Sequence, residues 1–249
     1  MKIGILGSRG IPNQYGGFEE FAEHLALGLK EKNASVWVYC SANHPYKSPG
    51  WNGINLIHCP DPEENLGTAG QFIYDFHCIR DSRTRNFDII YQLGYTSSSV
   101  WFRLLPEGPA IVTNMDGLEW KRSKYNRLVR RFLKYAEKLA VHTSDALIAD
   151  SKAIQKYLLD EYQAVSDFIP YGANIFNHPD EQLIRDKGLE PGKYYLLIAR
   201  MQQDNHIEEI IKGVLNSDDG IPLLVVGNTR NKLGTYLRKH YENERIRFP

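Results

Sequence analysis

Short apolar runs alternate with amphipathic segments along most of the chain. Runs with the length and β-branched character of buried strands lie at 2–7, 35–40, 54–59, 87–94, 110–117 and 146–151. The spacing of apolar residues between them predicts helices from about residue 17 and over 68–84, 97–105, 121–142 and 152–161, with a loop over 43–55. This alternation is typical of a parallel sheet covered by helices on both faces. We therefore predict an α/β fold.

The first strand leads through a glycine-rich loop into the first helix. Gly7, Gly10, Pro12, Gly16 and Gly17 interrupt regular structure before the helix begins. Such a loop directs backbone N–H groups and the positive end of a helix dipole at a ligand, so Gly16 and Gly17 are candidates for binding a phosphate or a sugar hydroxyl. A tight turn that only needs glycine is the alternative. The G-x-G-x-x-G pattern of nicotinamide-binding proteins and the Gly-Lys-Ser/Thr of P-loops are absent.

A second, smaller alternating unit begins near Pro191. It is predicted to hold strands at 193–200, 222–227 and 245–249 and helices at 206–215 and 232–242. The predicted organisation is a Rossmann-like domain over 1–170, a linker over 171–191 and a second Rossmann-like domain over 192–249. The chain stops on a strand, so we expect the second domain to be incomplete. Either the chain has been trimmed or the natural chain continues.

Composition excludes several classes of function. The 30 lysines and arginines balance the 30 aspartates and glutamates, so the net charge favours neither nucleic acid nor membrane as a partner. The three cysteines, Cys40, Cys59 and Cys78, match no zinc spacing and indicate reduced thiols in the cytoplasm. The chain has no run of about 20 apolar residues that would span a bilayer. No metal site is predicted.

Ligands of parallel α/β sheets bind at the carboxyl ends of the strands. In this chain those ends are the loops 7–17, 94–97, 115–120, 150–151 and 171–174. We expect the functional site to be assembled from these loops.

Several stretches together resemble the bacterial glycosyltransferases of the GT-B architecture, within the retaining family-4 group. The likeness is greatest to the branch of rhamnosyltransferases that build cell-surface polysaccharides. It is carried by GSRGIPNQYGGFEEF, NMDGLEWKRSKYNRL, IADS, IPYGAN and IARMQQDNHIEEIIKGV. The resemblance implies two Rossmann-like domains and transfer of a sugar from a nucleotide-diphosphate donor, with dTDP-L-rhamnose favoured, to a glycan or lipid-diphosphate-linked acceptor.

The resemblance also implies roles for particular residues. Asp116 matches the polar residue that reaches the transferred sugar or the acceptor hydroxyl, although an aspartate in a turn before Gly117 explains it equally well. Arg200 matches the cation that holds the diphosphate, and its guanidinium suits two phosphate oxygens. The remaining matched positions are Gly16, Gly17 and Asn205 on the diphosphate, and Arg9, Tyr15, Glu119 and Asn174 on the sugar and acceptor side.

Two departures from the family pattern affect the expected activity. Many members carry a lysine shortly after the arginine, whereas here Asn205 stands in that region. The family's glutamate pair lies beyond Pro249, so we expect this chain alone to bind donor weakly and turn over little. The implied mechanism is a front-face displacement in which the departing diphosphate helps to deprotonate the acceptor. It needs no metal, no cofactor and no protein nucleophile.

A basic segment over 121–138 stands out in an otherwise neutral chain. Eight lysines and arginines lie there, and Glu137 is the acidic residue among them. It predicts either a helix face that docks on anionic lipid at the inner face of the membrane or an ordinary solvated face. Arginines without a stacking platform give little support to nucleic-acid binding.

Two other functions are compatible with these features. A nucleotide-sugar epimerase has the same architecture and needs acid and base groups around the sugar ring. A non-catalytic sugar- or nucleotide-binding module would need only the binding loops.

Overall fold

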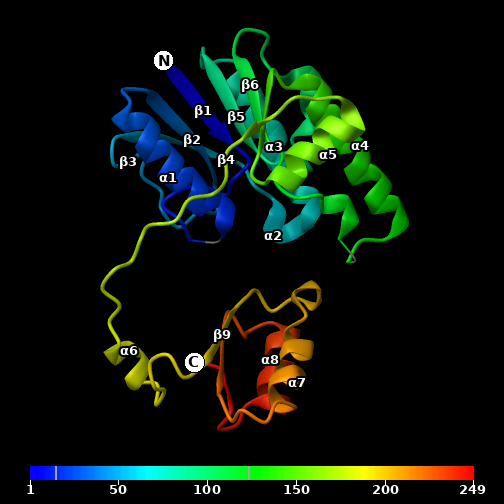
Figure 1. The fold of residues 1–249 in the computed structure, drawn as a ribbon. Coiled ribbons are helices and arrows are strands. Elements are labelled where there is room, and N and C mark those ends of the chain that lie inside the picture. Colours follow the sequence, from blue (N-terminus) through cyan, green and yellow to red (C-terminus); the bar gives the residue numbers. More distant parts are fainter. Residues whose placement is uncertain (15, 123) are drawn as a thin grey trace. The chain divides into compact units, whose positions relative to one another are not determined.

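The computed structural model describes residues 1–14, 16–122 and 124–249, which divide into two compact units. The first unit lies within 1–121 and 125–172, and the second contains 122, 124 and 173–249. Each has its own sheet flanked by helices (Figure 1).

Among the described residues, the first unit is built on an eight-stranded sheet in the order β3-β4-β2-β1-β5-β6-β7-β8. Neighbouring strands are parallel except for β3, which pairs antiparallel with β4. The strands are β1 (Lys2–Leu6), β2 (Ser35–Ser41), β3 (Gly50–Trp51), β4 (Ile54–Cys59), β5 (Ile89–Leu93), β6 (Ala110–Asn114), β7 (Ala146–Ala149) and β8 (Asp167–Phe168).

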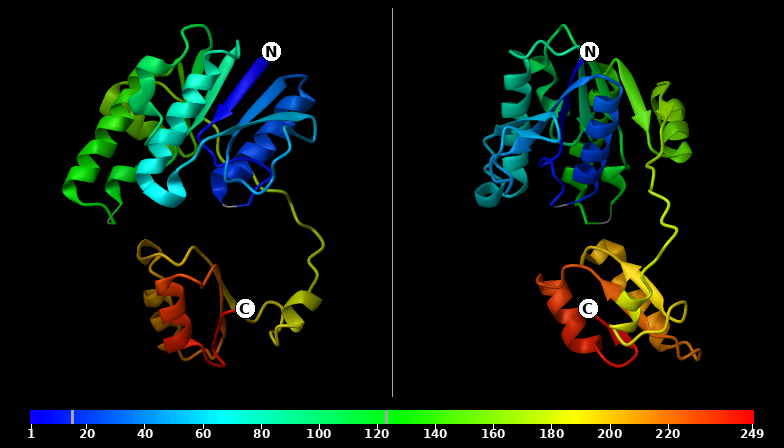
Figure 2. Two further views of the ribbon diagram at one scale, coloured as in Figure 1. Left: turned by 180° about the vertical axis from the view of Figure 1, so that it is seen from behind. Right: turned by 90° about the vertical axis from the view of Figure 1, so that its left-hand side faces the viewer.

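Helices cover both faces of this sheet because successive strand side chains point to opposite faces. Ile5 of β1 joins a core with α1, and the next residue, Leu6, joins a second core with α3. Figure 2 shows α3 (cyan) in front of the sheet when the unit is seen from behind. The helical elements are α1 (Gly17–Glu31), α2 (Glu63–Leu66), α3 (Thr68–Ser82), η1 (Ser99–Leu104), η2 (Glu119–Lys121), α4 (Arg127–Thr143) and α5 (Lys152–Tyr162).

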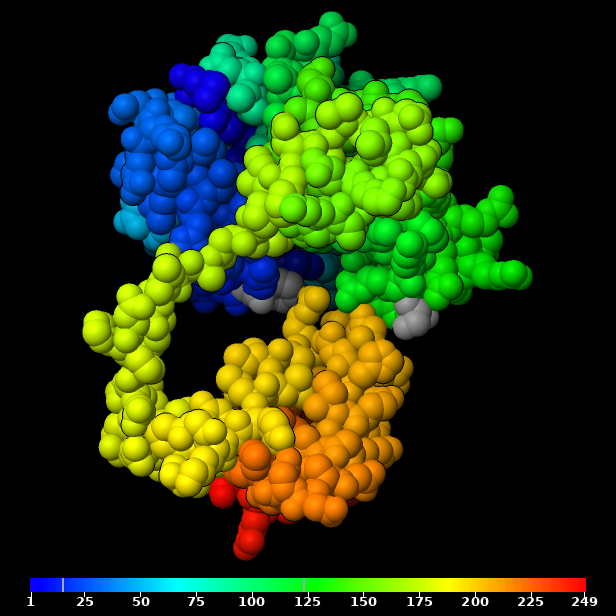
Figure 3. All heavy atoms as spheres, viewed as in Figure 1, coloured from blue at the N-terminus to red at the C-terminus, as the bar shows by residue number. Residues whose placement is uncertain are grey.

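A third core lies between α4, α5 and the far end of the sheet. Ala136 and Ala140 of α4 meet Leu158 of α5, and Leu147 of β7 lies beneath them. The small alanines let the helix approach the sheet closely. The outer side of α5 forms part of the surface of the first unit (yellow-green in Figure 3).

The second unit contains a three-stranded parallel sheet in the order β11-β10-β9. Met201, Ile207, Ile211 and Leu223 contribute to its separate core. Its elements are α6 (Gln182–Arg185), β9 (Tyr195–Ile198), η3 (Gln203–Asn205), α7 (Ile207–Leu215), β10 (Leu223–Val226), α8 (Lys232–Tyr241) and β11 (Ile246–Arg247). None of the helices in the described part of the chain is long and apolar enough to cross a bilayer.

The short helix predicted over 97–105 is confirmed as the 3-10 helix η1. The sequence predictions were wrong at two places. The loop predicted over 43–55 contains β3. The predicted basic helix over 121–138 is not one helix, because α4 begins at Arg127. Asn126 stops it there, since its side chain accepts the backbone N–H of Val129 and caps the helix.

Candidate functional site

The carboxyl end of β1 is the point where the strand order reverses. β1 lies between β2 and β5, and the connections run away from it in opposite directions. Ligands of doubly wound sheets bind at such a switch point. The two loops that follow β1 and β5 approach closely here: a Cβ on Gly7, whose φ is +94°, would lie 2.4 Å from the carbonyl oxygen of Leu93. Gly7 is therefore required by the fold itself.

The loop between β1 and α1 is held by carboxylates from the first turns of α1. Glu19 accepts the backbone N–H of Arg9 at 2.7 Å, and Glu23 accepts that of Asn13 at 2.7 Å. Glu20 accepts the side-chain amide of Asn13 at 2.5 Å. These three contacts fix the loop before any ligand arrives.

The start of α1 leaves space at the two glycines predicted to bind a diphosphate. The N-cap residue is Gly16. Among the described residues, a Cβ on Gly17 would meet no atom within 4 Å apart from its chain neighbours and the backbone of its own helix. A Cβ on Gly16 would lie 3.4 Å from the Glu19 carboxylate. The first-turn N–H groups and the helix dipole therefore offer an anion site, with the buried Glu19 carboxylate limiting its depth. Whether Gly16 and Gly17 bind a diphosphate stays a prediction.

Arg9 lies in the same loop and points its guanidinium at α2. It donates to both carboxylate oxygens of Glu63, at 2.9 Å and 2.6 Å, in a half-buried pair. A bidentate pair of this kind fixes the side chain. Tyr15, the neighbouring prediction, lies outside the described residues.

Buried polar groups lie directly beneath these loops. Asp75 of α3 accepts a hydrogen bond from Ser97, which follows β5, and Tyr74 donates to the carbonyl oxygen of Ser8, which follows β1. Burial raises the pKa of the Asp75 carboxyl to about 7, against the hydrogen bond from Ser97, which lowers it. Sequence analysis missed Asp75, because it lies inside a helix rather than at a strand end.

Asp116 follows β6 in a backbone conformation that favours glycine. Its φ is +44°, and its N–H donates to the side-chain oxygen of buried Asn114 at 3.0 Å. A left-handed residue that is not glycine is strained and is held only by its surroundings. The Asn114 amide nitrogen lies 3.5 Å from the Tyr171 hydroxyl, so the ends of β6 and β8 meet at this point.

Tyr171 was not predicted as a site residue. Burial, together with the carboxylates of Asp116 and Asp150, raises the pKa of its hydroxyl to about 12. Its ring and that of Phe21 from α1 pack edge to face, with ring centroids 5.1 Å apart. The sequence signal was present, because Asp150 and Tyr171 both lie in loops predicted at strand ends, and Asn114 directly precedes such a loop.

Glu119 begins η2, three residues after Asp116, and its carboxylate lies 3.5 Å from the Tyr125 hydroxyl. Asn174, Arg200 and Asn205 belong to the second unit. Asn205 donates its side-chain amide to the carbonyl oxygen of Arg200 at 2.6 Å, so these two residues are local neighbours. That Arg200 faces the glycine loop of the first unit stays a prediction.

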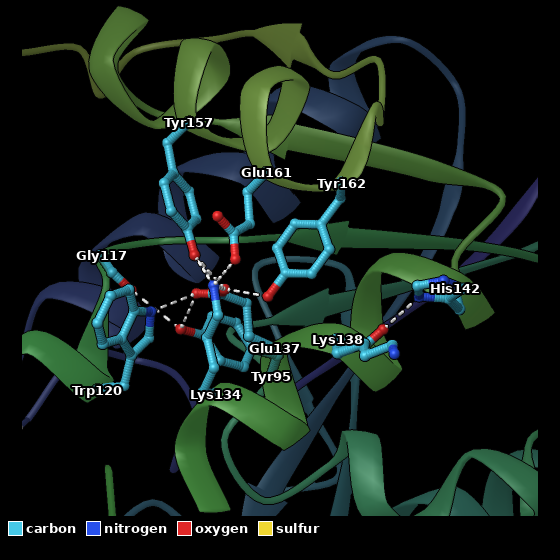
Figure 4. A network of polar contacts seen from close by, with 10 residues as sticks. All are labelled: Tyr95, Gly117, Trp120, Lys134, Glu137, Lys138, His142, Tyr157, Glu161 and Tyr162. Carbon is cyan, nitrogen blue, oxygen red and sulfur yellow. Dashed lines mark hydrogen bonds and ion pairs between the residues drawn. The ribbon is translucent and has the colours of Figure 1, made fainter. Parts of the chain in front are cut away.

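Glu137 of α4 is the centre of a polar network that sequence analysis did not identify (Figure 4). The residue is fully buried. Donors from four segments surround its carboxylate, with heavy-atom distances of 2.6 Å to Tyr157, 2.6 Å to Tyr162, 3.0 Å to Trp120, 3.1 Å to Lys134 and 3.3 Å to Tyr95.

One outer face of α4 is apolar and exposed. Leu128 is 76% exposed, Tyr135 56% and Phe132 37%, and their spacing of four and three residues aligns them along the helix. Arg127, Arg131 and Lys138 also lie on α4, away from its buried residues. Lys134, predicted as part of the basic face, instead turns into the Glu137 network.

Comparison with known proteins identifies the fold. Sucrose-phosphate synthase from Thermosynechococcus elongatus has a TM-score of 0.77 and 16% identity, covering 100% of this chain and 70% of that one. UDP-GlcNAc 2-epimerase from Methanocaldococcus jannaschii scores 0.57 at 12% identity, covering 100% and 73%. The lipopolysaccharide outer core galactosyltransferase WaaB scores 0.56 at 12% identity, covering 100% and 67%. These likenesses confirm the predicted α/β fold of the GT-B class.

No curated protein sequence matches the chain. A sequence family described as "Domain of unknown function (DUF1972)" matches residues 1–174, which include the whole eight-stranded sheet and all the loops at its carboxyl edge. The chain belongs to this DUF1972 family.

Proposed function

We propose that this protein is a glycosyltransferase that moves a sugar from a nucleotide-diphosphate donor to a glycan or lipid-linked saccharide acceptor. The observation that carries the proposal is the start of α1 at the switch point of the sheet, where the N-cap residue is glycine and the described residues leave open space beside Gly17. Phosphate groups are among the anions that such a helix end binds. Enzymes acting on nucleotide sugars are among the proteins that share the fold.

In this proposal the donor and the acceptor are held by different groups. Amides at Gly16 and Gly17 bind the diphosphate, and Arg200 with Asn205 supplies charge and a hydrogen bond from the second unit. We assign Asp116 the role of stabilising positive charge at the anomeric carbon. Glu119, Asn174, Arg9 and Tyr15 form the sugar and acceptor side in this proposal. The acceptor oxygen bonds to the anomeric carbon on the face from which the diphosphate departs, and the bond between that carbon and the diphosphate oxygen breaks. A phosphate oxygen of the leaving group takes the acceptor proton, and attack on that face retains the configuration of the sugar. L-rhamnose, carried as dTDP-L-rhamnose for polysaccharide synthesis, is the sugar that the sequence resemblance favours.

A pair of glycine variants on one helix tests the binding site. Neither Gly17→Ala nor Gly28→Ala introduces a contact within 4 Å, so both variants should fold like the parent. Ligands that bind the folded state raise its melting temperature. We expect a panel of nucleotide-diphosphate sugars to raise the melting temperature of the parent and of Gly28→Ala, with dTDP-L-rhamnose among the active compounds. Gly17→Ala should lose this shift, because its methyl group occupies the space of the diphosphate.

Because we expect this chain to bind donor weakly, the panel is run at ligand concentrations high enough to populate a weak complex. The proposal fails if no nucleotide sugar or nucleoside diphosphate shifts the parent under those conditions, or if Gly17→Ala responds as Gly28→Ala does. The panel needs no turnover, so it stays informative if the 249-residue chain transfers sugar slowly, as we predict.

An epimerase is the second candidate, because the enzyme from Methanocaldococcus jannaschii shares the fold. Product analysis separates the two. An epimerase inverts the configuration at one carbon of the sugar, and its product is still a nucleotide sugar. A transferase releases the nucleoside diphosphate. Asp116→Ala separates both from a binding module, since a module keeps its whole function without that carboxylate.

We also propose that α4 docks on anionic lipid at the inner face of the membrane and does not bind nucleic acid. The exposed residues Leu128, Phe132 and Tyr135 supply apolar surface, and neighbouring arginines supply charge. Vesicles containing phosphatidylglycerol should sediment the protein at low salt, and 0.5 M salt should release it, since the attraction is screened over about 10 Å at 0.1 M. Arg127→Gln with Arg131→Gln should abolish binding, whereas Lys239→Gln on α8 should not. Equal sedimentation with neutral vesicles would contradict an electrostatic contact.

A further inference from the structure

The Glu137 carboxylate has more donors than its amide analogue could satisfy. Tyr157 and Tyr162 both donate to Oε1 at 2.6 Å, and Trp120 donates to Oε2 at 3.0 Å. An ionised carboxylate accepts at both oxygens, whereas a glutamine has one oxygen and one NH₂ group that cannot accept. The two halves of this carboxylate therefore serve two different parts of the chain.

The Oε1 side holds α4 to α5. Tyr157 and Tyr162 belong to α5, and Lys134 joins them with its ammonium nitrogen 4.8 Å from the centroid of each of these rings. Lys134 also pairs with Glu161 at 2.9 Å. Burial lowers the pKa of Lys134, but its hydrogen bonds with Tyr157, Tyr162, Glu161 and Glu137 outweigh that and raise the pKa well above its ordinary value. The lysine therefore stays charged and compensates the buried carboxylate.

The Oε2 side holds the loop that follows β6. Trp120 of η2 donates to it, and the Tyr95 hydroxyl lies 3.3 Å both from Oε2 and from the carbonyl oxygen of Gly117. Gly117 is the residue next to Asp116. The strained loop is thus held on one side by Asn114 and on the other by Glu137 with Tyr95.

We propose that Glu137 is a positioning residue: its carboxylate fixes the loop over 115–120 and so places Asp116 and Glu119 at the carboxyl edge of the sheet. This inference rests on the proposed function for the roles of those two residues. The fixing of the loop itself rests on the network alone.

Two variants of the same network separate the two sides of the carboxylate. In Glu137→Gln the single amide oxygen is expected to keep the two tyrosine hydroxyls, which leaves the NH₂ group facing the Trp120 N–H. The loop then loses its anchor. Tyr162→Phe is the matched control, because it removes a hydrogen bond of equal length on the α5 side and leaves the Trp120 contact in place.

Hydrogen exchange of the 249-residue chain, followed by mass spectrometry, measures how well the loop amides are protected, and it needs no ligand. We expect the amides of 115–120 to exchange about tenfold faster in Glu137→Gln, as loss of one buried hydrogen bond implies, and to be unchanged in Tyr162→Phe. Trp120 fluorescence should shift in the first variant and not in the second. Equal exchange of 115–120 in the two variants would overturn the proposal.

Hydrolysis of dTDP-L-rhamnose tests the consequence for Asp116: water takes the rhamnosyl group and dTDP is released. The rate is measured in single turnovers with protein in excess. We expect Glu137→Gln to lower the rate about tenfold at unchanged donor affinity, and to have no further effect in an Asp116→Ala background, because residues that act through one another are not additive. An additive loss would overturn the coupling to Asp116. If the loop loosens as expected while Asp116→Ala keeps full activity, the proposed role of Asp116 fails and the anchoring by Glu137 stands.

Discussion

Asp75 is a carboxyl group that the fold keeps away from water at the switch point. Its pKa of about 7 lies above the ordinary value of 3.8, so the unfolded chain loses this proton first as the pH rises. Stability from the protonated group is complete below pH 4 and falls as the pH rises through 7. Asp75→Asn cannot ionise and still accepts from Ser97. Between pH 5 and 8 we expect the parent to lose about 2 to 3 kcal/mol of unfolding free energy relative to this variant.

Urea unfolding at the two pH values measures this difference, and other titrating groups cancel in the comparison. A parent and variant that change in parallel would show that Asp75 stays ionised in the folded protein.

Gly7 and Gly108 differ in what a methyl group would meet. At Gly7 it would lie 2.4 Å from a backbone oxygen and force a left-handed alanine, whereas at Gly108 it would meet no atom within 4 Å. We expect Gly7→Ala to cost about 3 kcal/mol or more, from strain and overpacking together, and Gly108→Ala to change stability by less than about 1 kcal/mol. Chemical denaturation of both variants checks this. Similar midpoints would contradict the close contact between the loops after β1 and β5.

Helix α5 is capped by a single side-chain oxygen, that of Ser151, so a substitution that deletes this oxygen removes the cap. The Ser151 hydroxyl accepts the backbone N–H of Ile154 at 3.2 Å, and the Ser151 backbone is extended as a capping residue requires. Ser151→Ala should lower the unfolding free energy by about 1 kcal/mol, and Ser151→Asp should restore most of it. Equal losses in both variants would show that the hydroxyl does something other than cap the helix.

Elements that depend on local sequence could be predicted, and those that depend on distant partners could not. The run at 2–7 gives β1, and the glycines that follow place the start of α1 at Gly17, because both signals are adjacent in the chain. The sequence prediction begins α4 six residues too early, although the capping residue Asn126 is visible in the sequence. The basic charge over 121–126 resembles a helix face, but the Asn126 cap fixes the start of the helix after that segment.

The candidate site shows the same division. Asn114, Asp116 and Tyr171 come together because parallel strands end at one edge, so strand ends alone could have predicted their proximity. Glu137 could not be predicted, because its donors come from residues 95, 120, 157 and 162 as well as from its own helix. In the sequence it resembles one acidic residue in a basic run, whereas it is fully buried.

At the scale of the whole molecule, the cores are separate. Ile90 is fully buried in the core between β5 and α3, and Ile211 is fully buried in the core of the second unit. Each core draws its residues from one unit, so a cavity in one removes apolar burial from that unit alone. We expect Ile211→Ala to destabilise 173–249 by about 2 to 5 kcal/mol and Ile90→Ala to destabilise the first unit by a similar amount.

Hydrogen exchange across a urea series assigns each loss to its unit. In Ile211→Ala the amides of α7 and β10 should lose protection at lower urea while those of β1 and β5 keep theirs, and Ile90→Ala should reverse the pattern. Because the two cores share no described residue, a cavity in one removes no buried side chain from the other, so we expect the transitions to move independently. If either variant shifts both sets of amides together, the units unfold as one cooperative body, and their stability cannot be divided between two cores.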